Sequence, residues 1–547
     1  MARSRSRKTS STQTDLTLVE GGELSIKALE TWLWDAASAI RGATDAPKFK
    51  DFILPLLFFK RLSDVFEGEM HAFTQQYGSQ DVARAVVEAD HAAALAEGRR
   101  PLVRFFVPEG ASWNALRHHD AEASGKVLGE FVTDTLRTVA RLNPDLHGVL
   151  DVKDFAERQA GQRLLDDDRL GALVEILSRH RLGLADARPD VLGQAYEYLL
   201  RKFAEGQGQS AGEFFTPPEV GLLLGRLLHL PPQATVYDPT CGSGGLLIKA
   251  RMAYEHDHPG TTEAPHLFGQ ELNPTTYAIA RMNMALHDYG TARIAVGDTF
   301  RDPQFRADGA GLHRFTAVVA NPMWNQKGYA DAFFANDPWK RFAKGTPPST
   351  SADWAWIQHI AASLDETSGR AAIVLDTGAV SRGSGARGRD RERDLRKAFV
   401  EANLIEGVVL LPENLFYNTT APGILLVLRT GRPEGRGVLL VNASQAFVKR
   451  KPKNELTQDG ADRVAHAFSN WAEAPRFARI VSPEEIEAAD YNLSPSAFVE
   501  TAERAELRTP EAILADLDAA RATREAADRR LTDLLATLGL APAEVTA

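Results

Sequence analysis

A tetrapeptide, Asn321-Pro-Met-Trp324, directly follows the apolar run Phe315 to Ala320. The side-chain amide of Asn321 and the backbone carbonyl of Pro322 can together accept both hydrogens of a planar amine, and Trp324 offers a flat surface on which a base can stack. Accepting both hydrogens favours the nitrogen lone pair leaving conjugation, so that the nitrogen can attack a methyl donor. The pattern therefore indicates methyl transfer to an amine, although Asn-Pro most often simply makes a turn after a strand.

A glycine-rich loop, Asp238-Pro-Thr-Cys-Gly-Ser-Gly-Gly245, precedes a helical pattern that begins at Leu246. Its glycines let the backbone turn tightly and come close to a ligand, and the helix start offers free N–H groups. The loop lacks the G-x-G-x-x-G spacing of a dinucleotide site, and the carboxylate of Asp238 would repel a pyrophosphate. It suits a ligand with an ammonium group, which points to an amino-acid-bearing nucleotide such as S-adenosylmethionine.

Acidic residues also follow the next two predicted strands. Glu271 stands where a carboxylate commonly accepts hydrogen bonds from ribose hydroxyls. Asp298 could accept a hydrogen bond from an exocyclic adenine amine. Each acid alone is more often a solvated turn residue, but acids at three consecutive strand ends, counting Asp238, favour a common ligand.

These side chains need a scaffold that brings strand ends together. After Gly212, short apolar or β-branched runs alternate with helix-length segments, which predicts an α/β domain with a mostly parallel, doubly wound, Rossmann-like sheet. Ligands bind such sheets at the carboxyl ends of the strands. The predicted strands are Ala234–Tyr237, His266–Phe268, Arg293–Val296, Phe315–Ala320, Ala371–Leu375, Ile405–Leu411, Gly423–Leu428 and Gly437–Val441.

Two flanking regions have helical patterns instead. From Leu24 to about Leu182, apolar residues at helical spacing predict an all-helical N-terminal domain. Residues 509–538 carry an apolar heptad seam, interrupted at Arg524, of the kind that packs against a partner helix. An amphipathic helix folded back on its own domain fits the seam equally well. The seam consists of Ile513, Leu517, Ala520, Ala527, Leu531, Leu534 and Leu538.

The charge balance bears on nucleic acid as a partner. The 547 residues include 63 Lys and Arg against 73 Asp and Glu, and this net charge of -10 argues weakly against DNA. Residues 481–547 hold 6 basic and 14 acidic residues, so -8 of that charge belongs to the tail and only -2 to residues 1–480. Basic stretches remain at Ser381–Lys397 and Lys449–Lys453, where a phosphate backbone could pass. The charge therefore does not exclude DNA.

Other features limit the compartment and the chemistry. The single cysteine, Cys241, excludes an intrachain disulfide and a cysteine-built zinc site. The polar, basic start from Met1 to Glu20 is unlike a secretory signal, and the longest apolar run, Phe52 to Phe59, is too short to span a bilayer. These patterns predict a cytoplasmic protein with no membrane partner. No metal site is predicted.

Taken in order, the loop from Asp238 to Gly245, Glu271, Asp298 and the tetrapeptide resemble the amino-directed DNA methyltransferases, whose hallmark is Asn-Pro-Pro-aromatic. Upstream, the segment from Gly212 to Pro218 is similar to the family's cofactor-contacting segment. More narrowly, roughly residues 24 to 500 resemble the modification subunit of type I restriction–modification systems. The further matching segments are Trp32–Asp64, Ala352–Trp354, Gln358–His359, Leu404–Val408, Leu411–Tyr417 and Asp490–Leu493.

The resemblance implies a reaction and its residues. A methyl group would pass from S-adenosylmethionine to the N6 amine of an adenine flipped out of duplex DNA, with Asn321, Pro322 and Trp324 as catalytic residues. Cys241 is assigned a packing role, because transfer to an exocyclic amine needs no thiol. The residues implied for the cofactor are Glu213, Phe214, Phe215, Thr216, Pro217, Pro218, Asp238, Gly242, Ser243, Gly244, Gly245, Glu271 and Asp298.

The resemblance also implies partners. A separate specificity subunit would read the DNA sequence and bind two copies of this chain, with the heptad helix as the docking element. The chain has no G-x-x-x-x-G-K-[ST] loop, so an ATP-dependent restriction subunit would be another polypeptide. The predicted parts are a flexible basic tail (1–23), a helical N-terminal domain (24–182), a methyltransferase domain (183–480) and a helical partner-docking tail (481–547).

One departure and several alternatives stay open. Met323 replaces the second proline of the family's tetrapeptide, and the resulting looser loop could change base preference or rate. The same chemistry serves enzymes that methylate a protein glutamine or an RNA base, and cytosine N4 presents the same geometry as adenine N6. A catalytically decayed scaffold is a further alternative, against which the intact acids and the intact Asn321-Pro322 argue.

Overall fold

The computed structural model describes residues 25–40, 49–159, 161–187, 193, 195–199, 201–202, 216–307, 311–327, 329–417, 419–501 and 510–539. The chain divides into two compact units, Met1–Val499 and Glu500–Ala547. The predicted tail 1–23 lies outside the described residues. No helix among the described residues is long and apolar enough to cross a membrane.

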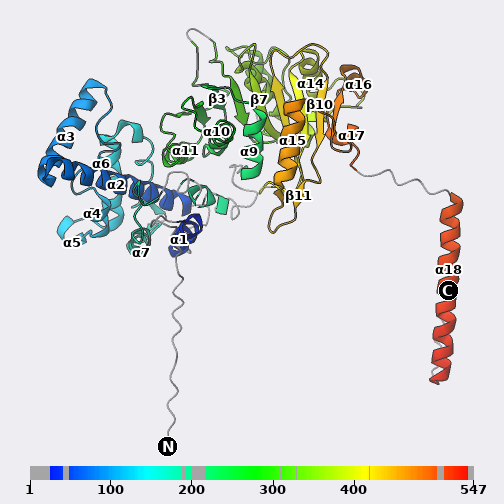
Figure 1. The fold of residues 1–547 in the computed structure, drawn as a ribbon, viewed down its shortest axis with the longest axis horizontal. Helices are drawn as coiled ribbons and strands as arrows, with labels where there is room; N and C mark the ends of the chain where they lie inside the picture. Colours follow the sequence, from blue (N-terminus) through cyan, green and yellow to red (C-terminus); the bar gives the residue numbers. More distant parts are fainter. Residues whose placement is uncertain are drawn as a thin grey trace, which may run out of the picture. The chain divides into compact units, whose positions relative to one another are not determined.

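Helices build the first part of the larger unit, drawn in blue and cyan in Figure 1. The apolar run Phe52–Phe59 lies in the long helix α2 and is buried throughout, because this helix passes through the middle of the helical core. The helices are α1 (Ile26–Ala39), α2 (Phe49–Tyr77), α3 (Gln80–Glu97), α4 (Trp113–Arg117), α5 (Ala121–Ser124), α6 (Leu128–Leu142), η2 (Pro144–Leu146) and α7 (Asp167–Leu177).

The prediction that this region is all-helical needs one correction. Strands β1 (Arg158–Gln159) and β2 (Gln162–Arg163) pair as an antiparallel hairpin. Gly161 in its turn has a φ of 84°, a left-handed conformation that suits a two-residue hairpin loop. A pair of two-residue strands leaves no alternating apolar pattern, so the sequence carries no signal for it.

A nine-stranded sheet forms the second part of the unit. Its strand order is β13-β10-β8-β9-β7-β6-β3-β4-β5, and β9 runs antiparallel to both of its neighbours. All eight predicted strands are confirmed, whereas β13, an antiparallel edge strand, has only four residues and was not predicted. The strands are β3 (Thr235–Asp238), β4 (His266–Glu271), β5 (Arg293–Val296), β6 (Ala317–Ala320), β7 (Arg370–Asp376), β8 (Ile405–Leu410), β9 (Gly423–Arg429), β10 (Val438–Asn442) and β13 (Ala478–Val481).

Helices cover both faces of the sheet, as a doubly wound fold requires (Figure 1). Successive residues of β7 point to opposite faces: Ala372 and Val374 pack with α9, α10 and α15, and Ile373 packs with α13 and α14. The helices are α9 (Pro218–Leu227), α10 (Gly245–Asp257), α11 (Pro274–Leu286), α12 (Asp331–Ala335), α13 (Asp353–Ala362), η4 (Thr377–Val380), α14 (Arg391–Glu401), α15 (Gln458–Asn470), α16 (Pro483–Ala488) and α17 (Pro495–Phe498), and a small hairpin pairs β11 (Phe447–Val448) with β12 (Glu455–Leu456).

The two parts of this unit share a core. Ala278, Ile279, Met282 and Leu286 of α11 belong to the same buried cluster as the N-terminal helices. At the other end, the unit continues past the predicted boundary at residue 481, because residues from α16 to Val499 complete the core on one face of the sheet. The N-terminal helices are therefore packed directly against the domain that holds the glycine-rich loop.

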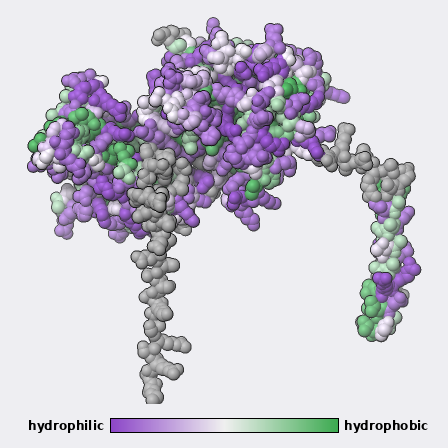
Figure 2. Space-filling view, viewed as in Figure 1, coloured by the Kyte–Doolittle hydropathy of each residue, from purple (hydrophilic) through white to green (hydrophobic). Residues whose placement is uncertain are grey.

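The smaller unit is a single described helix, α18 (Pro510–Thr537). Its seam residues Ile513, Leu517, Leu531 and Leu534 are between 46% and 60% exposed, so the helix presents an apolar stripe that nothing in its own unit covers among the described residues. Apolar side chains gather along this helix in Figure 2. The helix is confirmed, while the packing of its seam against a partner stays a prediction.

Candidate active site

The glycine-rich loop and the tetrapeptide meet at one edge of the sheet. The loop joins β3 to α10, Asn321 directly follows β6, and β3 pairs in parallel with β6. The chain continues from β3 to β4 on one side and returns to β6 on the other, so this is the switch point where doubly wound sheets bind ligands. The predicted residues that line a cavity of about 70 Å³ here are Thr216, Pro218, Asp238, Gly242, Ser243, Gly245 and Asn321.

Positive backbone angles shape the glycine-rich loop. Gly242 and Gly244 have φ values of 54° and 79°, and the Gly244 N–H donates to the Cys241 carbonyl at 2.7 Å. A Cβ at Gly244 would lie 2.5 Å from Met284 Cε, so the loop also needs glycine for space. Cys241 is buried against Gly269, and burial raises the pKa of its thiol, in agreement with a packing role.

Asp238 is the most unusual acid of the site. Its side chain is buried, and Oδ1 accepts hydrogen bonds from the backbone N–H of Thr240 at 2.9 Å and from its hydroxyl at 3.4 Å. Burial raises the pKa of Asp238 to about 7, and the charge of Glu271 adds to this effect. A cation placed beside Asp238 would relieve the cost of ionising it, so the site favours a positively charged group.

Glu271 and Asp298 do not line the cavity, and part of each carboxylate is used locally. Glu271 Oε2 accepts from the N–H of Gly242 at 3.0 Å, and Oε1 accepts from that of Asn273 at 2.8 Å. Asp298 Oδ1 accepts from the N–H groups of Phe300 and Arg301 at 2.9 and 3.1 Å. Both acids lie at the expected strand ends, while their contact with a ribose and an adenine stays a prediction.

Gln270 ties these strand ends together and was missed by the sequence reasoning. It is fully buried, its Nε2 donates to the carbonyls of Gly297 and Asp302 at 3.1 and 2.9 Å, and its Oε1 accepts from the Gln304 N–H at 3.0 Å. Buried amides of this kind rigidify a loop when all their bonds are made. Gln270 therefore fixes the loop that carries Asp298.

The orientation of the Asn321 amide is set by its neighbours. The indole Nε1 of Trp324 donates to Asn321 Oδ1 at 3.2 Å, and Asn321 Nδ2 donates to Thr216 Oγ1 at 2.9 Å. An indole N–H can only donate, so it is the amide oxygen that must face it. Oδ1 keeps a second lone pair with which it can accept from an incoming amine. Trp324 in turn packs edge-on against Phe416, with ring centroids 5.0 Å apart.

The other members of the predicted set lie close by. Pro217 and Pro218 begin α9, where the Pro217 carbonyl accepts from the Gly221 N–H at 3.0 Å. Pro322 is buried at the end of β6, whereas Met323, which replaces the family's second proline, is 40% exposed. Glu213, Phe214 and Phe215 lie outside the described residues.

A buried ion cluster supports the turn after the tetrapeptide. Asp353 is fully buried; its Oδ1 accepts from the Asn325 N–H at 2.9 Å and its Oδ2 pairs with Arg382. Arg382 also pairs with Glu392 and, at 3.0 Å, with Asp376. Removing Arg382 would leave Asp353 and Glu392 as buried charges without a counterion, so the cluster locks the turn.

This cluster uses part of the charge of the basic stretch Ser381–Lys397, whereas Arg387 and Arg389 are exposed, so the passage of a phosphate backbone there stays a prediction. Arg382 is committed to three carboxylates, and the fully buried Arg396 donates to the carbonyls of Tyr491 and Arg382. Charged side chains are conspicuous in a sequence whether they face water or a buried carboxylate, so the charge count alone cannot separate the two cases.

Comparison with known proteins decides the family. Residues 187–507, more than half of the chain, match the N-6 DNA methylase family, and residues 29–177 match the HsdM N-terminal domain. The chain belongs to the N-6 DNA methylases. Among relatives of this methylase, the MjaVIII methylase subunit of a type I restriction enzyme from Methanocaldococcus jannaschii is 31% identical over 470 residues, covering 83% of this chain and 75% of the relative.

Two further proteins place the methylase more narrowly. The HindI methylase subunit of a type I restriction enzyme from Haemophilus influenzae is 30% identical over 427 residues, covering 73% of this chain and 90% of the relative. The crystal structure of the type I restriction–modification methyltransferase subunit from Streptococcus thermophilus superposes with a TM-score of 0.74 and 28% identity, covering 87% of this chain and 100% of that chain. The helical N-terminal part and the sheet are thus both those of type I methylase subunits.

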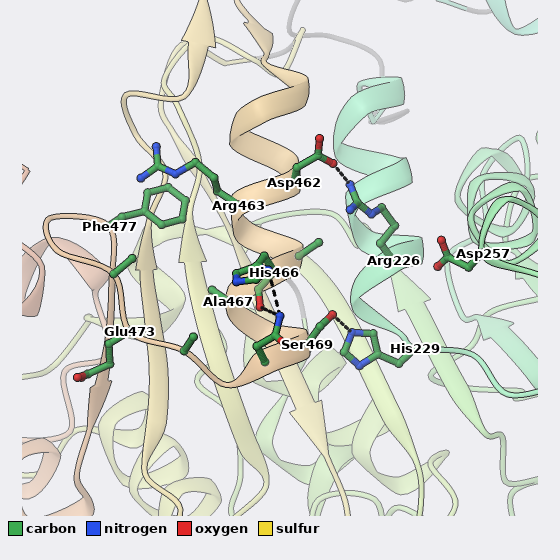
Figure 3. A pocket seen from close by; sticks show the side chains of 14 residues that line it. Arg226, His229, Asp257, Asp462, Arg463, His466, Ala467, Ser469, Glu473 and Phe477 are labelled. Atoms are coloured by element: carbon green, nitrogen blue, oxygen red, sulfur yellow. Dashed lines mark hydrogen bonds and ion pairs between the residues drawn. The ribbon is translucent and has the colours of Figure 1, made fainter.

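A larger cavity of the methylase lies elsewhere. It measures about 740 Å³ and lies beside α15 and the end of α9 (Figure 3). Its polar residues bond to one another: Arg226 pairs with Asp462 at 2.5 Å, and Ser469 Oγ lies 3.1 Å from His229 Nε2. Burial lowers the pKa of His229 to about 4, so the ring is neutral. Among the described residues, no group of three or more His, Cys, Asp or Glu side chains is arranged to hold a metal ion.

Proposed function

We propose that this methylase transfers its methyl group in the crevice between β3 and β6, with the amine of the target base held by Asn321 and Pro322. The observation that carries this proposal is the fixed orientation of the Asn321 amide, whose oxygen faces the Trp324 indole and has a lone pair to spare. The relatives are named methylase subunits of type I restriction enzymes, and the family is that of N-6 DNA methylases, so the base is adenine and its amine is N6. A target adenine lies inside the DNA stack, and flipping it into the crevice costs a few kcal/mol.

S-adenosylmethionine fits the residues at this crevice and, when bound, supplies an electrophilic methyl group. Asp238, buried and with a raised pKa, suits the ammonium of an amino acid, and the glycine loop from Gly242 to Gly245 lets a ligand approach its backbone. By the same family resemblance, Glu271 would accept from the ribose and Asp298 would lie near the adenine of the cofactor. Thr216, Pro217 and Pro218 would complete the site.

The protein's own contribution is to orient and desolvate the accepting amine. Asn321 Oδ1 and the Pro322 carbonyl accept its two hydrogens, and Trp324 stacks on the base. Met323 contributes only a side chain that is 40% exposed, and both acceptors come from other residues, so the proline that it replaces is not needed for them. The protein-glutamine, RNA and cytosine alternatives share this geometry, and what favours DNA adenine is the family.

We also propose the partners of the complex. DNA and a specificity subunit that binds two copies of this chain are the partners, and an ATP-dependent restriction subunit, where the system has one, is another polypeptide. The exposed apolar seam of α18 supports a docking role for this helix. Because the substrate is DNA, the proposed compartment is the cytoplasm.

The test of the active site is the Asn321→Ala variant, purified with its specificity subunit. Labelled S-adenosylmethionine and DNA should give methyladenine with the wild type, and we expect the variant to be slower by about a hundredfold or more. Binding of S-adenosylhomocysteine, measured by calorimetry, should stay within about twofold. Asn336→Ala is a matched control, because Asn336 is an exposed asparagine at the end of α12 whose side-chain amide donates to Ala332 O. Methylation by Asn321→Ala at the wild-type rate would refute the assignment.

A further inference from the structure

A buried ion pair that the sequence reasoning did not find lines the same cavity as Asp238 and Asn321. Lys249 Nζ lies 2.6 Å from Glu197 Oε2, and the two side chains are only 10% and 11% exposed. Lys249 lies in the second turn of α10, and Glu197 comes from the helical residues 195–199, before β3 in the chain. The pair therefore joins a segment outside the sheet to the wall of the crevice.

The bonding of this pair is incomplete within the described residues. Glu197 Oε1 is buried and makes no hydrogen bond there. His287 Nε2 is 3.9 Å from Glu197 Oε1, but burial, helped by the charge of Lys249, lowers the pKa of His287 to about 3, so the ring is neutral and does not compensate the carboxylate. Besides Glu197, the acceptor that Lys249 Nζ has among the described residues is the weak Met252 Sδ, at 3.7 Å. An acceptor and at least one donor proton thus stay available beside the cavity, which is costly unless a ligand uses them.

The position of the pair indicates which part of a cofactor would reach it. The cavity includes Asn321, which holds the accepting amine in the proposed function, and excludes Glu271 and Asp298, which are assigned to the nucleoside. In S-adenosylmethionine the group on the far side of the reacting sulfonium from the nucleoside is the amino acid. The cavity therefore lies on the amino-acid side of the crevice.

The charges of the cavity match an amino acid better than a phosphate. Asp238 and Glu197 supply two carboxyl groups and Lys249 one ammonium, so an anion without a positive charge of its own would meet net repulsion. A zwitterion can place its ammonium near the carboxylates and its carboxylate near the lysine. Charge-assisted hydrogen bonds of this kind are about twice as strong as neutral ones.

We propose that Lys249 and Glu197 form the subsite for the amino-acid end of the cofactor, with Lys249 binding its α-carboxylate and Glu197, together with Asp238, binding its α-ammonium. This inference rests on the proposed function. It gives the segment before β3 a direct part in cofactor recognition, since Glu197 lies upstream of every residue that the sequence assigned to the cofactor.

The experiment compares two ligands that differ only in the carboxylate, S-adenosylmethionine and decarboxylated S-adenosylmethionine, by calorimetry on the purified chain. The wild type should bind the first at least about tenfold more tightly, because a hydrogen bond to a charged group contributes about 1.5–3 kcal/mol. Lys249→Met should bind the two ligands with equal affinity. Arg251→Met is the matched control: Arg251 lies on the same helix, pairs with Glu255 at 2.5 Å and does not line the cavity, so the discrimination should persist.

A second variant keeps the test decisive if Lys249→Met fails to fold, because that substitution leaves Glu197 buried without a counterion. Replacing both partners, as in Lys249→Met with Glu197→Leu, removes the buried charges together and is commonly neutral for stability. It too should bind the two ligands equally. Equal binding by the wild type, or a lysine-free variant that still discriminates tenfold, would overturn the subsite. Wild-type protein that binds neither ligand would instead refute the proposed cofactor.

Discussion

The crevice between β3 and β6 and the cavity beside α15 differ in the bonding of their polar groups as well as in volume, which is about 70 Å³ against about 740 Å³. The larger cavity is lined by polar groups that bond to one another near the surface, as in the pair Arg226–Asp462, whose side chains are 31% and 51% exposed. In the smaller one, Asp238 is buried with a raised pKa and Glu197 has a buried oxygen without a hydrogen bond among the described residues. In the proposed function, buried polar groups with unused hydrogen-bonding capacity, and not cavity volume, mark the active site.

If burial is what distinguishes the two cavities, we expect a large loss of stability at Arg382, which pairs with the carboxylates that hold the turn after the tetrapeptide. Arg382→Met would strand the buried Asp353 and Glu392, whose side chains are 0% and 6% exposed. We expect the free energy of unfolding to fall by about 3 kcal/mol, because breaking a buried ion pair leaves an uncompensated charge. The measurement is the urea midpoint and the melting temperature of the purified chain.

Arg226→Met, at the larger cavity, is the matched control for Arg382→Met. It removes an equally short ion pair, with Asp462, but at the surface, where such pairs contribute about 0–1 kcal/mol. Equal destabilisation by the two substitutions would show that burial does not separate the two cavities. It would also remove the argument that Arg382 locks the turn after Trp324.

Sequence reasoning found the strands of the sheet and the residues at their ends for a physical reason. Parallel strands covered on both faces are short continuous apolar runs, and the ligand-binding residues directly follow them, so β3 and β6 led to Asp238 and Asn321. The interactions that sequence reasoning missed join residues that are far apart in the chain. Lys249 and Glu197 are 52 residues apart, and Asn321 and Thr216 are 105 apart, and no local spacing encodes such contacts.

The same limit explains why the sequence did not separate the buried arginines of the basic stretch from its exposed ones, and why the roles of Glu271 and Asp298 stay predictions. Arg382 and Arg396 look like surface charges in sequence, and only the fold shows the carboxylates and carbonyls that they meet. Glu271 and Asp298 do lie at strand ends, yet their hydrogen bonds to Gly242 and Phe300 are those of ordinary turn residues. The sequence was enough to predict where these acidic residues lie in the fold. It could not show how much hydrogen-bonding capacity their carboxylates keep for a ligand.

Asp238 should show a pH-dependent effect on stability of opposite sign. Its pKa is about 7 in the fold against 3.8 for the free side chain, so the fold is most stable, with respect to this group, below pH 3.8 and loses stability as the pH rises to 7. The full loss is on the order of 4 kcal/mol, because each pH unit between the two pKa values corresponds to about 1.36 kcal/mol. Asp238→Asn should therefore raise the melting temperature at pH 8 and have little effect at pH 4. It should also weaken binding of S-adenosylhomocysteine at pH 8.

The pH dependence separates the raised pKa from other effects of that substitution. A gain in melting temperature of the same size at both pH values would mean that the introduced asparagine simply packs better. It would contradict the assignment of the Asp238 carboxyl as a group that binds a cation. In the wild type, the affinity for S-adenosylhomocysteine should fall below pH 7, because protonated Asp238 no longer offers a full negative charge to the ligand's ammonium.

The smallest effect is predicted at the larger cavity. Arg370 can only donate, so its bond to His229 Nδ1 places the proton of the neutral ring on Nε2, which donates to Ser469 Oγ at 3.1 Å. Ser469→Ala removes this one partly exposed bond, and we expect the free energy of unfolding to change by about 0.5 kcal/mol, with methylation and cofactor affinity unaltered. A tenfold loss of methylation in a normally folded Ser469→Ala protein would mean that the cavity beside α15 takes part in function. Buried polar groups without hydrogen bonds would then not be sufficient to locate the active site of this protein.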